Sequence, residues 1–349
     1  MRGVIRNIVG SLFRGLLQLL RWIGGDASIL LKEYAKEVER WDRVFVTYHD
    51  RPVQATQINL YTDVVHRAAD LAVVLQGPLW KDHDFTLETV KLYRRHFGSA
   101  AIIVSTWDDE ESEVVSELVN LGAEVLLNEK PAYSGTSNIN LQIVSSRNGI
   151  LRAKELGVEY VVKTRTDQRM YAPDIGDFLH NMVETFPVSR DATLKGRVVG
   201  VSLNTFKYRM YGLSDMLTYG HIEDLLLYWS TDLDMRIFSQ EEIRRFNTPR
   251  KWAKCRLCEV YLATEFLKKV GHDLKWTLED SWLAFARYFC VVDKEQLDMF
   301  WPKYNRLEYP SRTYKRLTNS FQELSFRDWL NIYRNLDSME VPDEVAGSE

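Results

Sequence analysis

A regular alternation of short apolar runs and longer amphipathic segments constrains the fold of this chain most. Continuous apolar runs of about six to nine residues predict buried strands, and apolar residues spaced three and four apart predict the helices between them. The predicted strands are residues 71–77, 100–107, 123–128, 159–167 and 198–206, and predicted helices begin near residues 84, 114 and 139. This order predicts an α/β fold with a doubly wound, mostly parallel sheet and helices on both faces.

Polar side chains follow several of the predicted strands at the points where they end. Ligands of parallel sheets bind beyond the carboxyl ends of the strands, so we expect a nucleotide site there. No dinucleotide or Walker glycine motif is present, which favours a nucleotide held by side chains and single backbone amides. For any one of these residues taken alone, a role in a turn or cap is the better explanation, but four successive strand ends share the pattern. The donor-binding candidates here are Gln76, Gly77, Thr106, Trp107, Lys163, Arg165, Asp167, Gln168 and Arg169.

Asp167 is the most informative of these residues because it follows an apolar strand and lies between Arg165 and Arg169. A carboxylate in this position suits a divalent cation that bridges a diphosphate. The two arginines suit the phosphate oxygens of a leaving nucleoside diphosphate. The alternative is an Asp–Arg ion pair at the surface, with little energetic value.

Asn138, Asn140 and Arg147 lie at or near the start of the long helix that precedes the fourth predicted strand. Helix amino-termini favour anions, so these side chains are candidates for contact with a uridine or a diphosphate. A helix cap followed by a solvent-facing arginine explains them equally well.

Several long strings resemble the WavE family of lipopolysaccharide-synthesis proteins. They include LAVVLQGP, EYVVKTRTDQRMY, NTFKYRMYGLSDMLTYGHIEDLLLYW, LKWTLEDSWLAFARYFCVVD and WPKY, and the likeness extends from about Leu71 to Trp301. The resemblance implies a GT-A-like fold and glycosyl transfer from a nucleotide sugar, with UDP-sugar as the expected donor. It also implies a bacterial lipopolysaccharide core, a surface polysaccharide or a lipid-linked glycan as acceptor.

The chain departs from the general GT-A pattern at the metal motif. Arg165-Thr166-Asp167 stands where two aspartates are usual, so only one carboxylate is present. Two alternatives stay open. Either Mn²⁺ or Mg²⁺ binds at Asp167, or an arginine takes over part of the role of the cation.

An inverting transfer, which we expect here, needs a carboxylate to take the proton of the acceptor hydroxyl. Asp280, with its neighbour Glu279, and Asp215 are the candidates. Each aspartate has a simpler interpretation, Asp280 as the cap of a helix beginning at Ser281 and Asp215 as the cap of the helix near residues 221–229. The aromatic candidates for acceptor contact are Tyr208, Tyr211 and Trp276.

We divide the chain into five segments. Residues 1–28 form an amphipathic helix with cationic charge and suit the surface of an anionic membrane. Three internal arginines make spanning costly, and no signal-peptide cleavage site follows. We therefore expect a peripheral protein on the cytoplasmic face of the plasma membrane, although the helix also suits packing on its own protein. The other segments are a connection (29–69), the nucleotide-sugar core (70–232), a mostly helical acceptor side (233–340) and a disordered tail (341–349).

Composition excludes some functions and leaves others open. The net charge of −4 argues against a nucleic-acid partner. Cys255 and Cys258 have zinc-knuckle spacing, but buried free thiols are the simpler interpretation. A sugar nucleotidyltransferase and a non-catalytic scaffold for polysaccharide assembly are the alternative functions. The first would normally show a glycine-rich, basic loop after the first strand, which is missing here.

Overall fold

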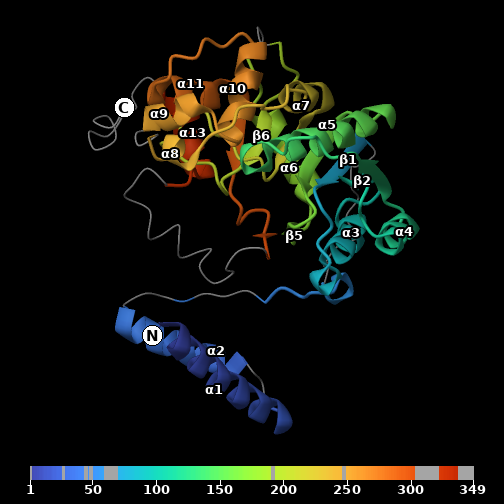
Figure 1. Cartoon of the computed structure of the whole chain (residues 1–349), viewed down its shortest axis with the longest axis vertical. Helices are drawn as coiled ribbons and strands as arrows, with labels where there is room; N and C mark the ends of the chain where they lie inside the picture. The colour runs from blue at the N-terminus through green and yellow to red at the C-terminus, as the bar shows by residue number, and fades with distance from the viewer. Residues whose placement is uncertain are drawn as a thin grey trace. The chain divides into compact units, whose positions relative to one another are not determined.

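The computed structural model describes residues 2–25, 28–42, 46, 50–58, 70–189, 193–245, 249–302 and 322–336 (Figure 1). The chain divides into two compact units, Met1–Arg51 and Pro52–Glu349. The predicted nucleotide-sugar core and the predicted acceptor side belong to the same unit. The predicted tail, residues 341–349, lies outside the described residues.

The first unit contains two helices, α1 (Arg2–Trp22) and α2 (Ser28–Asp42). The apolar side chains of α1 recur at helical spacing, and many of them are exposed, among them Ile8, Leu12, Leu16, Leu19 and Trp22. The helix contains arginines and no acidic residue. None of the helices in the described part of the chain combines the length and the apolar character that a membrane span needs.

The second unit is built on a seven-stranded sheet in the order β3-β2-β1-β4-β7-β6-β8. Only β7 runs antiparallel to its neighbours. The prediction of a mostly parallel, doubly wound sheet is confirmed. The strands are β1 (Leu71–Gln76), β2 (Ala101–Trp107), β3 (Glu124–Asn128), β4 (Tyr160–Arg165), β6 (Val198–Val201), β7 (Thr218–His221) and β8 (Phe289–Val292).

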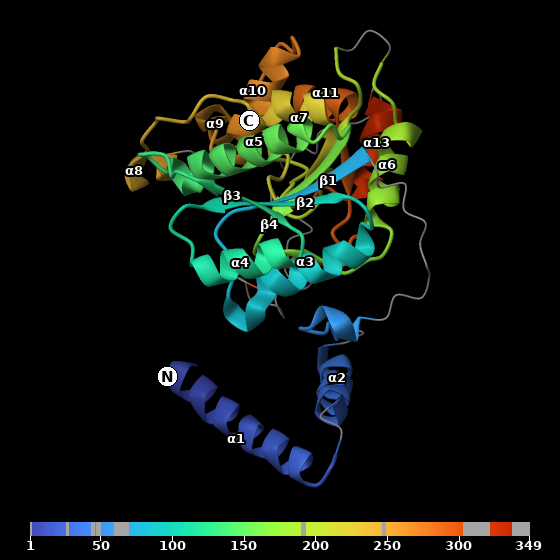
Figure 2. The same cartoon turned by 90° about the vertical axis from the view of Figure 1, so that its right-hand side faces the viewer.

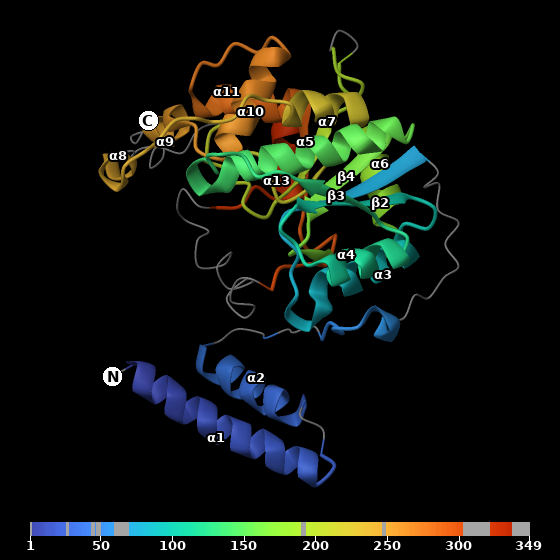
Figure 3. The same ribbon diagram turned by 45° about the vertical axis from the view of Figure 1, so that its right-hand side comes forward.

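Helices cover both faces of the sheet. In Figures 2 and 3, α3 (Phe85–His96) and α4 (Ser112–Asn120) lie on one face, and α5 (Ile139–Glu155) and α7 (Ile222–Trp229) lie on the other. On the side of α5, α10 (Glu259–Lys269) packs against α7. Three further helices, α6 (Ile175–Thr185), α11 (Leu278–Tyr288) and α13 (Phe326–Asn335), pack near the end of the sheet that holds β6 and β8.

The smaller elements connect these layers. Short helices α8 (Gln240–Arg245) and α9 (Pro249–Cys255) follow α7, and a two-stranded sheet pairs β5 (Arg169–Met170) with β9 (Met299–Phe300). Single 3-10 turns occupy Ala55–Gln57, Asp82–Asp84 and Thr136–Asn138. Asp84 precedes α3 as expected, but its side chain makes no capping hydrogen bond.

The sheet is held by apolar side chains that the sequence pattern identifies. All six residues of β1 are buried. Gly149 brings α5 close to the sheet, since a Cβ at this position would lie 2.4 Å from Val74 Cγ1 and 3.2 Å from Ser105 Cβ. This close contact fixes the height of α5 above β1 and β2, and with it the position of the helix amino-terminus.

Two features of the sheet differ from the sequence prediction. The fifth predicted strand, residues 198–206, is a strand only as far as Val201. The antiparallel strand β7 was not predicted, because Thr218-Tyr219-Gly220-His221 lacks a continuous apolar run. It exists because β4 and β6 bind it from both sides. It brings the segment before it, including Asp215, to the same edge as the ends of the parallel strands.

Candidate functional site

The carboxyl ends of the parallel strands meet at one edge of the sheet, which we call the carboxyl edge. The register places Gln76 opposite both Ser105 and Arg165, and Lys163 opposite Thr218 at the start of β7. Since α5 runs back from this edge to the start of β4, its amino-terminus lies at the same edge. Residues from four successive strand ends, from the segment before β7 and from the start of α5 therefore lie around it.

Lys163 is fully buried at this edge and fixes the segment before β7. Its Nζ lies 2.5 Å from the carbonyl oxygen of Asp215 and 4.2 Å from the centre of the Trp229 ring. Burial lowers the pKa of Lys163 to about 7, and the neighbouring Arg165 also lowers it, whereas Asp215 and Asp167 oppose the shift. The lysine thus holds a backbone carbonyl in place and shares its surroundings with two carboxylates and an arginine.

Arg165 and Asp167 form a two-point ion pair just beyond β4. Arg165 Nε and Nη2 donate to the two carboxylate oxygens of Asp167 at 2.8 and 2.9 Å. The guanidinium also lies 5.5 Å from the centre of the Trp301 ring. Both side chains are largely buried, so this pair is less screened by solvent than the surface pair considered as the alternative.

Asp215 lies between Lys163 and the start of α10. It is 4% exposed, and no described residue donates a hydrogen bond to its carboxylate. It does not cap α7, because His221 accepts the capping hydrogen bond of that helix from the Glu223 amide. A carboxylate at the carboxyl edge to which no described group donates is suited to accept a proton from a bound ligand.

Glu259 adds a second carboxylate beside Asp215, and sequence reasoning did not identify it. It opens α10 and binds the side-chain amide of Asn204, while Arg209 Nη1 lies 3.7 Å from its Oε2. Burial raises the pKa of Glu259, and the charge of Asp215 raises it further, while Arg209 and Asn204 oppose the rise. The only sequence signal was a glutamate heading the apolar run Val-Tyr-Leu-Ala.

Asp280 is bound on several sides by the protein. Its Oδ2 accepts hydrogen bonds from Tyr211 Oη at 2.5 Å and from the Lys275 amide at 3.0 Å, and it lies 3.3 Å from His272 Nε2. The residue is 4% exposed. It is not the cap of a helix that begins at Ser281: α11 begins at Leu278, and the Thr277 side chain caps it by accepting from the Asp280 amide.

The other catalytic and acceptor candidates differ in accessibility. Glu279 is exposed, next to Asp280 in the first turn of α11. Tyr211 is fully buried, and burial together with Asp280 raises its pKa. Its hydroxyl accepts a hydrogen bond from the Trp276 amide, and the two rings meet edge to face at 5.5 Å. Tyr208 and Trp276 are half-buried, so only these two of the three aromatic residues offer any surface.

Gln76 and Gly77 form the turn after β1. The Gln76 side-chain oxygen accepts a hydrogen bond from Ser145 Oγ on α5 at 2.8 Å. Gly77 has φ 113°, a backbone conformation that favours glycine, and a Cβ there would lie 3.3 Å from Thr166 Oγ1. Gln76 joins α5 to β1, and Gly77 permits the close approach of the two loops that follow β1 and β4.

Thr106, Trp107 and Gln168 are buried at neighbouring strand ends. The Thr106 hydroxyl donates to Glu110 at 3.1 Å. The amide nitrogen of Gln168 lies 3.1 Å from the sulfur of Met216, and no described residue pairs with its buried Oε1. Gln168 therefore keeps an unsatisfied acceptor in the region of Asp215, whereas Thr106 shapes its own loop.

Arg169 uses its guanidinium inside the protein. It is 1% exposed and donates to Thr89 Oγ1, Tyr171 Oη and the carbonyl oxygens of Phe85 and Val53 at 2.9 to 3.0 Å. The Phe85 ring lies 4.2 Å from the guanidinium carbon. These contacts join the loop after β4 to α3, and they occupy the groups that the sequence analysis assigned to phosphate.

The three candidates near the start of α5 have different surroundings. Asn138 is exposed, and its backbone has the left-handed conformation, with φ 64°. Asn140 is fully buried and exchanges hydrogen bonds with the backbone of Asp234, while its Nδ2 also donates to the Tyr133 carbonyl. Arg147 is half-buried and forms no ion pair with any described residue. Asn140 thus positions a neighbouring loop, and Arg147 keeps a guanidinium without a carboxylate partner.

The side chains present do not fit a metal site made by protein alone. Asp167 is a single carboxylate, and both of its oxygens already bind Arg165. Within the described residues, no group of three histidine, cysteine or acidic side chains is placed to hold an ion. The thiols of Cys255 and Cys258 donate to two different carbonyls, and burial raises their pKa values to about 11 and about 12.

Comparison with known families identifies the chain. A family model described as WavE lipopolysaccharide synthesis matches residues 71–346. The chain belongs to this family. The sequence resemblance is therefore confirmed, and the mostly parallel sheet with helices on both faces agrees with the α/β fold that it implies. Family membership supports a role in lipopolysaccharide synthesis.

Similar solved structures include mouse xyloside xylosyltransferase 1 in its apo form, with 9% sequence identity and a TM-score of 0.34 over 72% of this chain and 94% of that one. Another is a protein from Thermus thermophilus described as mannose-1-phosphate geranyltransferase, with 11% identity and a TM-score of 0.26 over 68% of this chain and 72% of that one. No curated protein matches the chain.

Proposed function

We propose that this protein transfers a sugar from a nucleoside-diphosphate sugar, with UDP as the expected nucleotide, to a lipopolysaccharide core or surface-polysaccharide acceptor. The proposal rests on one observation above all. Lys163, Arg165, Asp167 and Asp215 gather at the carboxyl edge of the sheet, and the Asp215 carboxylate has no hydrogen-bond donor among the described residues. Membership of a lipopolysaccharide-synthesis family supports the proposed acceptor class.

The cationic side of this cluster suits the leaving group. When the bond between the anomeric carbon and the diphosphate oxygen breaks, its electron pair stays on the diphosphate, which becomes more negative. Arg165 carries a planar guanidinium beside Trp301, in a partly buried place where charge interactions are stronger than in water. We assign the stabilisation of this charge to Arg165, which Asp167 orients. Arg169 has no part in this proposal, since protein groups bind its guanidinium.

Asp215 is the general base in this proposal. Its carboxylate takes the proton of the acceptor hydroxyl while the hydroxyl oxygen bonds to the anomeric carbon opposite the leaving diphosphate, which inverts that centre. Asp280 is the weaker candidate, because Tyr211 and the Lys275 amide bind its Oδ2. Glu279, Tyr208 and Trp276 remain candidates for contact with the acceptor. No proposed step passes through a divalent cation.

We further propose that α1 attaches the protein to the cytoplasmic face of an anionic membrane. Exposed apolar side chains with arginines and no acidic residue are typical of helices that lie in the membrane interface. This attachment would keep the enzyme at the surface where lipid-linked acceptors are found.

A thermal-shift screen with UDP-, GDP-, ADP- and CMP-sugars, each with and without Mn²⁺, tests the proposal. A donor at a hundred times its dissociation constant stabilises the folded state by about 2.7 kcal/mol. We expect the melting temperature to rise with one nucleoside-diphosphate sugar and this rise to be smaller in Arg165→Gln. A shift with the CMP-sugar alone would overturn the nucleoside-diphosphate assignment.

The two alternative functions give different results. A sugar nucleotidyltransferase would form a nucleotide sugar from a sugar phosphate and a nucleoside triphosphate, with release of pyrophosphate. If the protein is a scaffold, cells that carry the Asp215→Asn variant still produce the polysaccharide. If it is a transferase that uses Asp215 as its base, these cells lose polysaccharide production.

A further inference from the structure

A basic pocket lies between α8, α9 and the loop that follows α7. Its volume is about 600 Å³, and it is lined by Arg236, Phe238, Arg245, Lys251, Lys254 and Cys255. The four cationic side chains come from three segments of the chain. We call this set of six residues the basic pocket.

The charged side chains that line the basic pocket are all cationic. None of its described lining residues is acidic. Asp234 pairs with Arg236 from outside the lining, and Glu241 pairs with Arg245. Lys254 is exposed and forms no ion pair with a described residue. Lys254 thus brings positive charge to the pocket, although the total charge of the protein is −4.

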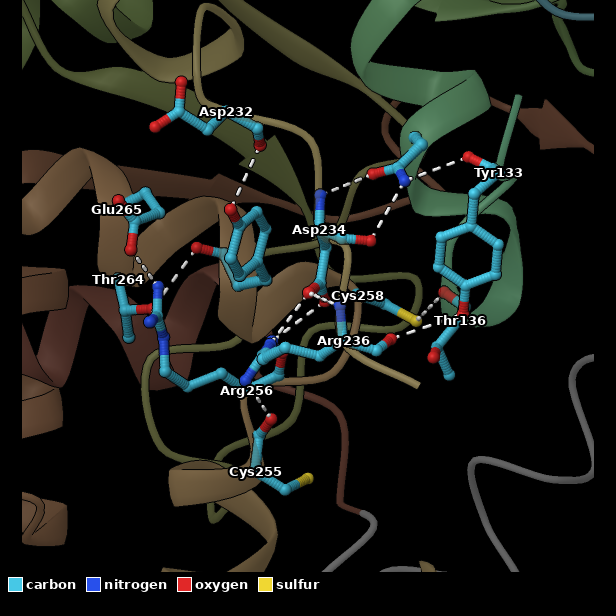
Figure 4. A network of polar contacts seen from close by, with 12 residues as sticks. Tyr133, Thr136, Asp232, Asp234, Arg236, Cys255, Arg256, Cys258, Thr264 and Glu265 are labelled. Carbon is cyan, nitrogen blue, oxygen red and sulfur yellow. Dashed lines mark hydrogen bonds and ion pairs between the residues drawn. The ribbon is translucent and has the colours of Figure 1, made fainter. Parts of the chain in front are cut away.

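A network of hydrogen bonds fixes the inner wall of the basic pocket (Figure 4). Arg236 Nε and Nη2 bind the two oxygens of Asp234 at 2.7 and 2.9 Å. The same guanidinium donates to the carbonyls of Cys255 at 2.9 Å and Arg256 at 2.7 Å. Arg236 thus links the loop after α7 to the end of α9 by its hydrogen bonds to the two carbonyls. The carboxylate of Asp234, which is 2% exposed, holds the guanidinium in place.

The basic pocket adjoins the carboxyl edge. The Asp234 backbone exchanges hydrogen bonds with Asn140 near the start of α5. The Cys258 thiol, three residues beyond Cys255, contacts the Thr136 carbonyl just before α5. Figures 2 and 3 both show α8 and α9 beside the amino-terminal end of α5. Glu259 follows Cys258 directly, and its pKa is raised in part by the charge of Asp215, so the chain that lines the basic pocket continues to the neighbourhood of the candidate base.

The lining also offers apolar surface. The Phe238 ring lies 5.3 Å from the Arg236 guanidinium carbon, and the lysine and arginine side chains add their aliphatic stems. An aromatic ring and aliphatic stems suit the C–H face of a sugar ring, and the ammonium and guanidinium groups at their ends suit an anion.

From these observations we propose that the basic pocket binds a phosphate group carried by the acceptor glycan. The inference rests on the proposed transferase function, and it narrows the acceptor to a phosphorylated saccharide. Lys251 and Lys254 bind phosphate oxygens, Phe238 packs against the sugar ring that carries the phosphate, and the next sugar extends toward Asp215.

Equilibrium binding of mannose 6-phosphate tests this inference, with mannose as the unphosphorylated comparison. We expect the full-length protein to bind the phosphorylated sugar and not mannose. The double variant Lys251→Gln/Lys254→Gln is expected to bind it at least about tenfold more weakly, since a charge-assisted hydrogen bond contributes about 1.5 kcal/mol or more. Lys195→Gln is the matched control, because Lys195 is exposed near the start of β6, at the opposite edge of the sheet.

The test separates this inference from the proposed function. Equal binding of mannose 6-phosphate by the double variant and the Lys195→Gln control would overturn the inference, whatever the donor assays show. Lysine-dependent binding to phosphatidylglycerol vesicles without binding of mannose 6-phosphate would also overturn it, because the phosphate would then belong to a lipid headgroup. If nucleotide sugar still raises the melting temperature of the double variant, its donor site is intact, and loss of mannose 6-phosphate binding then concerns the basic pocket alone.

Discussion

At the scale of single residues, the surroundings of Asp215 and Asp280 assign these two aspartates different roles. Asp215→Asn removes the proposed base, and loss of a general base lowers the rate about a hundredfold to ten-thousandfold. No described group donates to the Asp215 carboxylate, so the variant breaks no hydrogen bond of the described residues, and we expect the free energy of unfolding to change by about 1 kcal/mol or less. Steady-state transfer assays and urea unfolding measure the two effects.

Asp280→Ala is expected to act mainly on stability. The variant leaves the buried Tyr211 hydroxyl and the Lys275 amide without their acceptor, which costs about 2 to 4 kcal/mol. Glu279→Gln, one residue away and exposed, is its control and should melt like the wild type. A stable Asp280→Ala variant with no activity, beside an active Asp215→Asn, would reverse our assignment of the base.

Lys163 gives the protein a stability that depends on pH. Its pKa is about 7 in the folded protein, below the ordinary 10.5. Between these values the unfolded chain binds more protons than the folded one, so the free energy of unfolding rises with pH. Relative to Lys163→Met, we expect the wild type to gain up to about 1.4 kcal/mol per pH unit between pH 7 and 10. Urea unfolding at pH 7, 8 and 9 measures this gain, and parallel curves would contradict it.

The sequence predicted which residues lie at the strand ends, but not their partners. Lys163, Arg165 and Asp167 are expected to lie close together, because they are two residues apart at the end of one strand and that strand ends at the carboxyl edge. The engagement of Arg169 by α3 and the contact of Glu259 with Asn204 do not follow, because these partners are 55 or more residues apart in the chain. Only tertiary packing decides whether an arginine meets a ligand or a carbonyl.

At the scale of elements, the packing of α5 on the sheet determines where the start of this helix lies at the site. Gly149→Ala places a methyl group 2.4 Å from Val74 Cγ1 and 3.2 Å from Ser105 Cβ. Relief of this contact requires α5 to shift from the sheet, at a cost of about 1 to 3 kcal/mol. We expect a lower melting temperature together with weaker donor binding, because the start of α5 moves as well. A Gly149→Ala variant as stable as the wild type would contradict the close contact between α5 and the sheet.

Elements with long apolar runs were predictable, and those held by pairing alone were not. The strands β1, β2, β3 and β4 follow from such runs, and α5 begins at Ile139 as expected. Strand β7 contains a glycine and a histidine and depends on β4 and β6 for its existence. Strand β7 also places Asp215 at the carboxyl edge. The choice between Asp215 and Asp280 as the base therefore could not be made from the sequence, because β7 was not predicted.

At the scale of the whole molecule, the charge and apolar character of α1 predict selective membrane binding. We expect the full-length protein to sediment with vesicles that contain phosphatidylglycerol and less with purely zwitterionic ones. Leu12→Asp/Leu16→Asp should weaken this binding, since both side chains are exposed on the apolar helix. Unchanged sedimentation of this variant would assign the exposed face of α1 to another role.

Whether the protein is a transferase with Asp215 as its base is decided by nucleoside-diphosphate release from UDP-, GDP- and ADP-sugars. A CMP-sugar serves as comparison, and purified lipopolysaccharide serves as acceptor. We expect that one nucleoside-diphosphate sugar is consumed, that the acceptor accelerates its consumption, and that Asp215→Asn loses this acceleration while keeping the fold. Release from none of the three, or equal release by Asp215→Asn, would refute the proposed transfer.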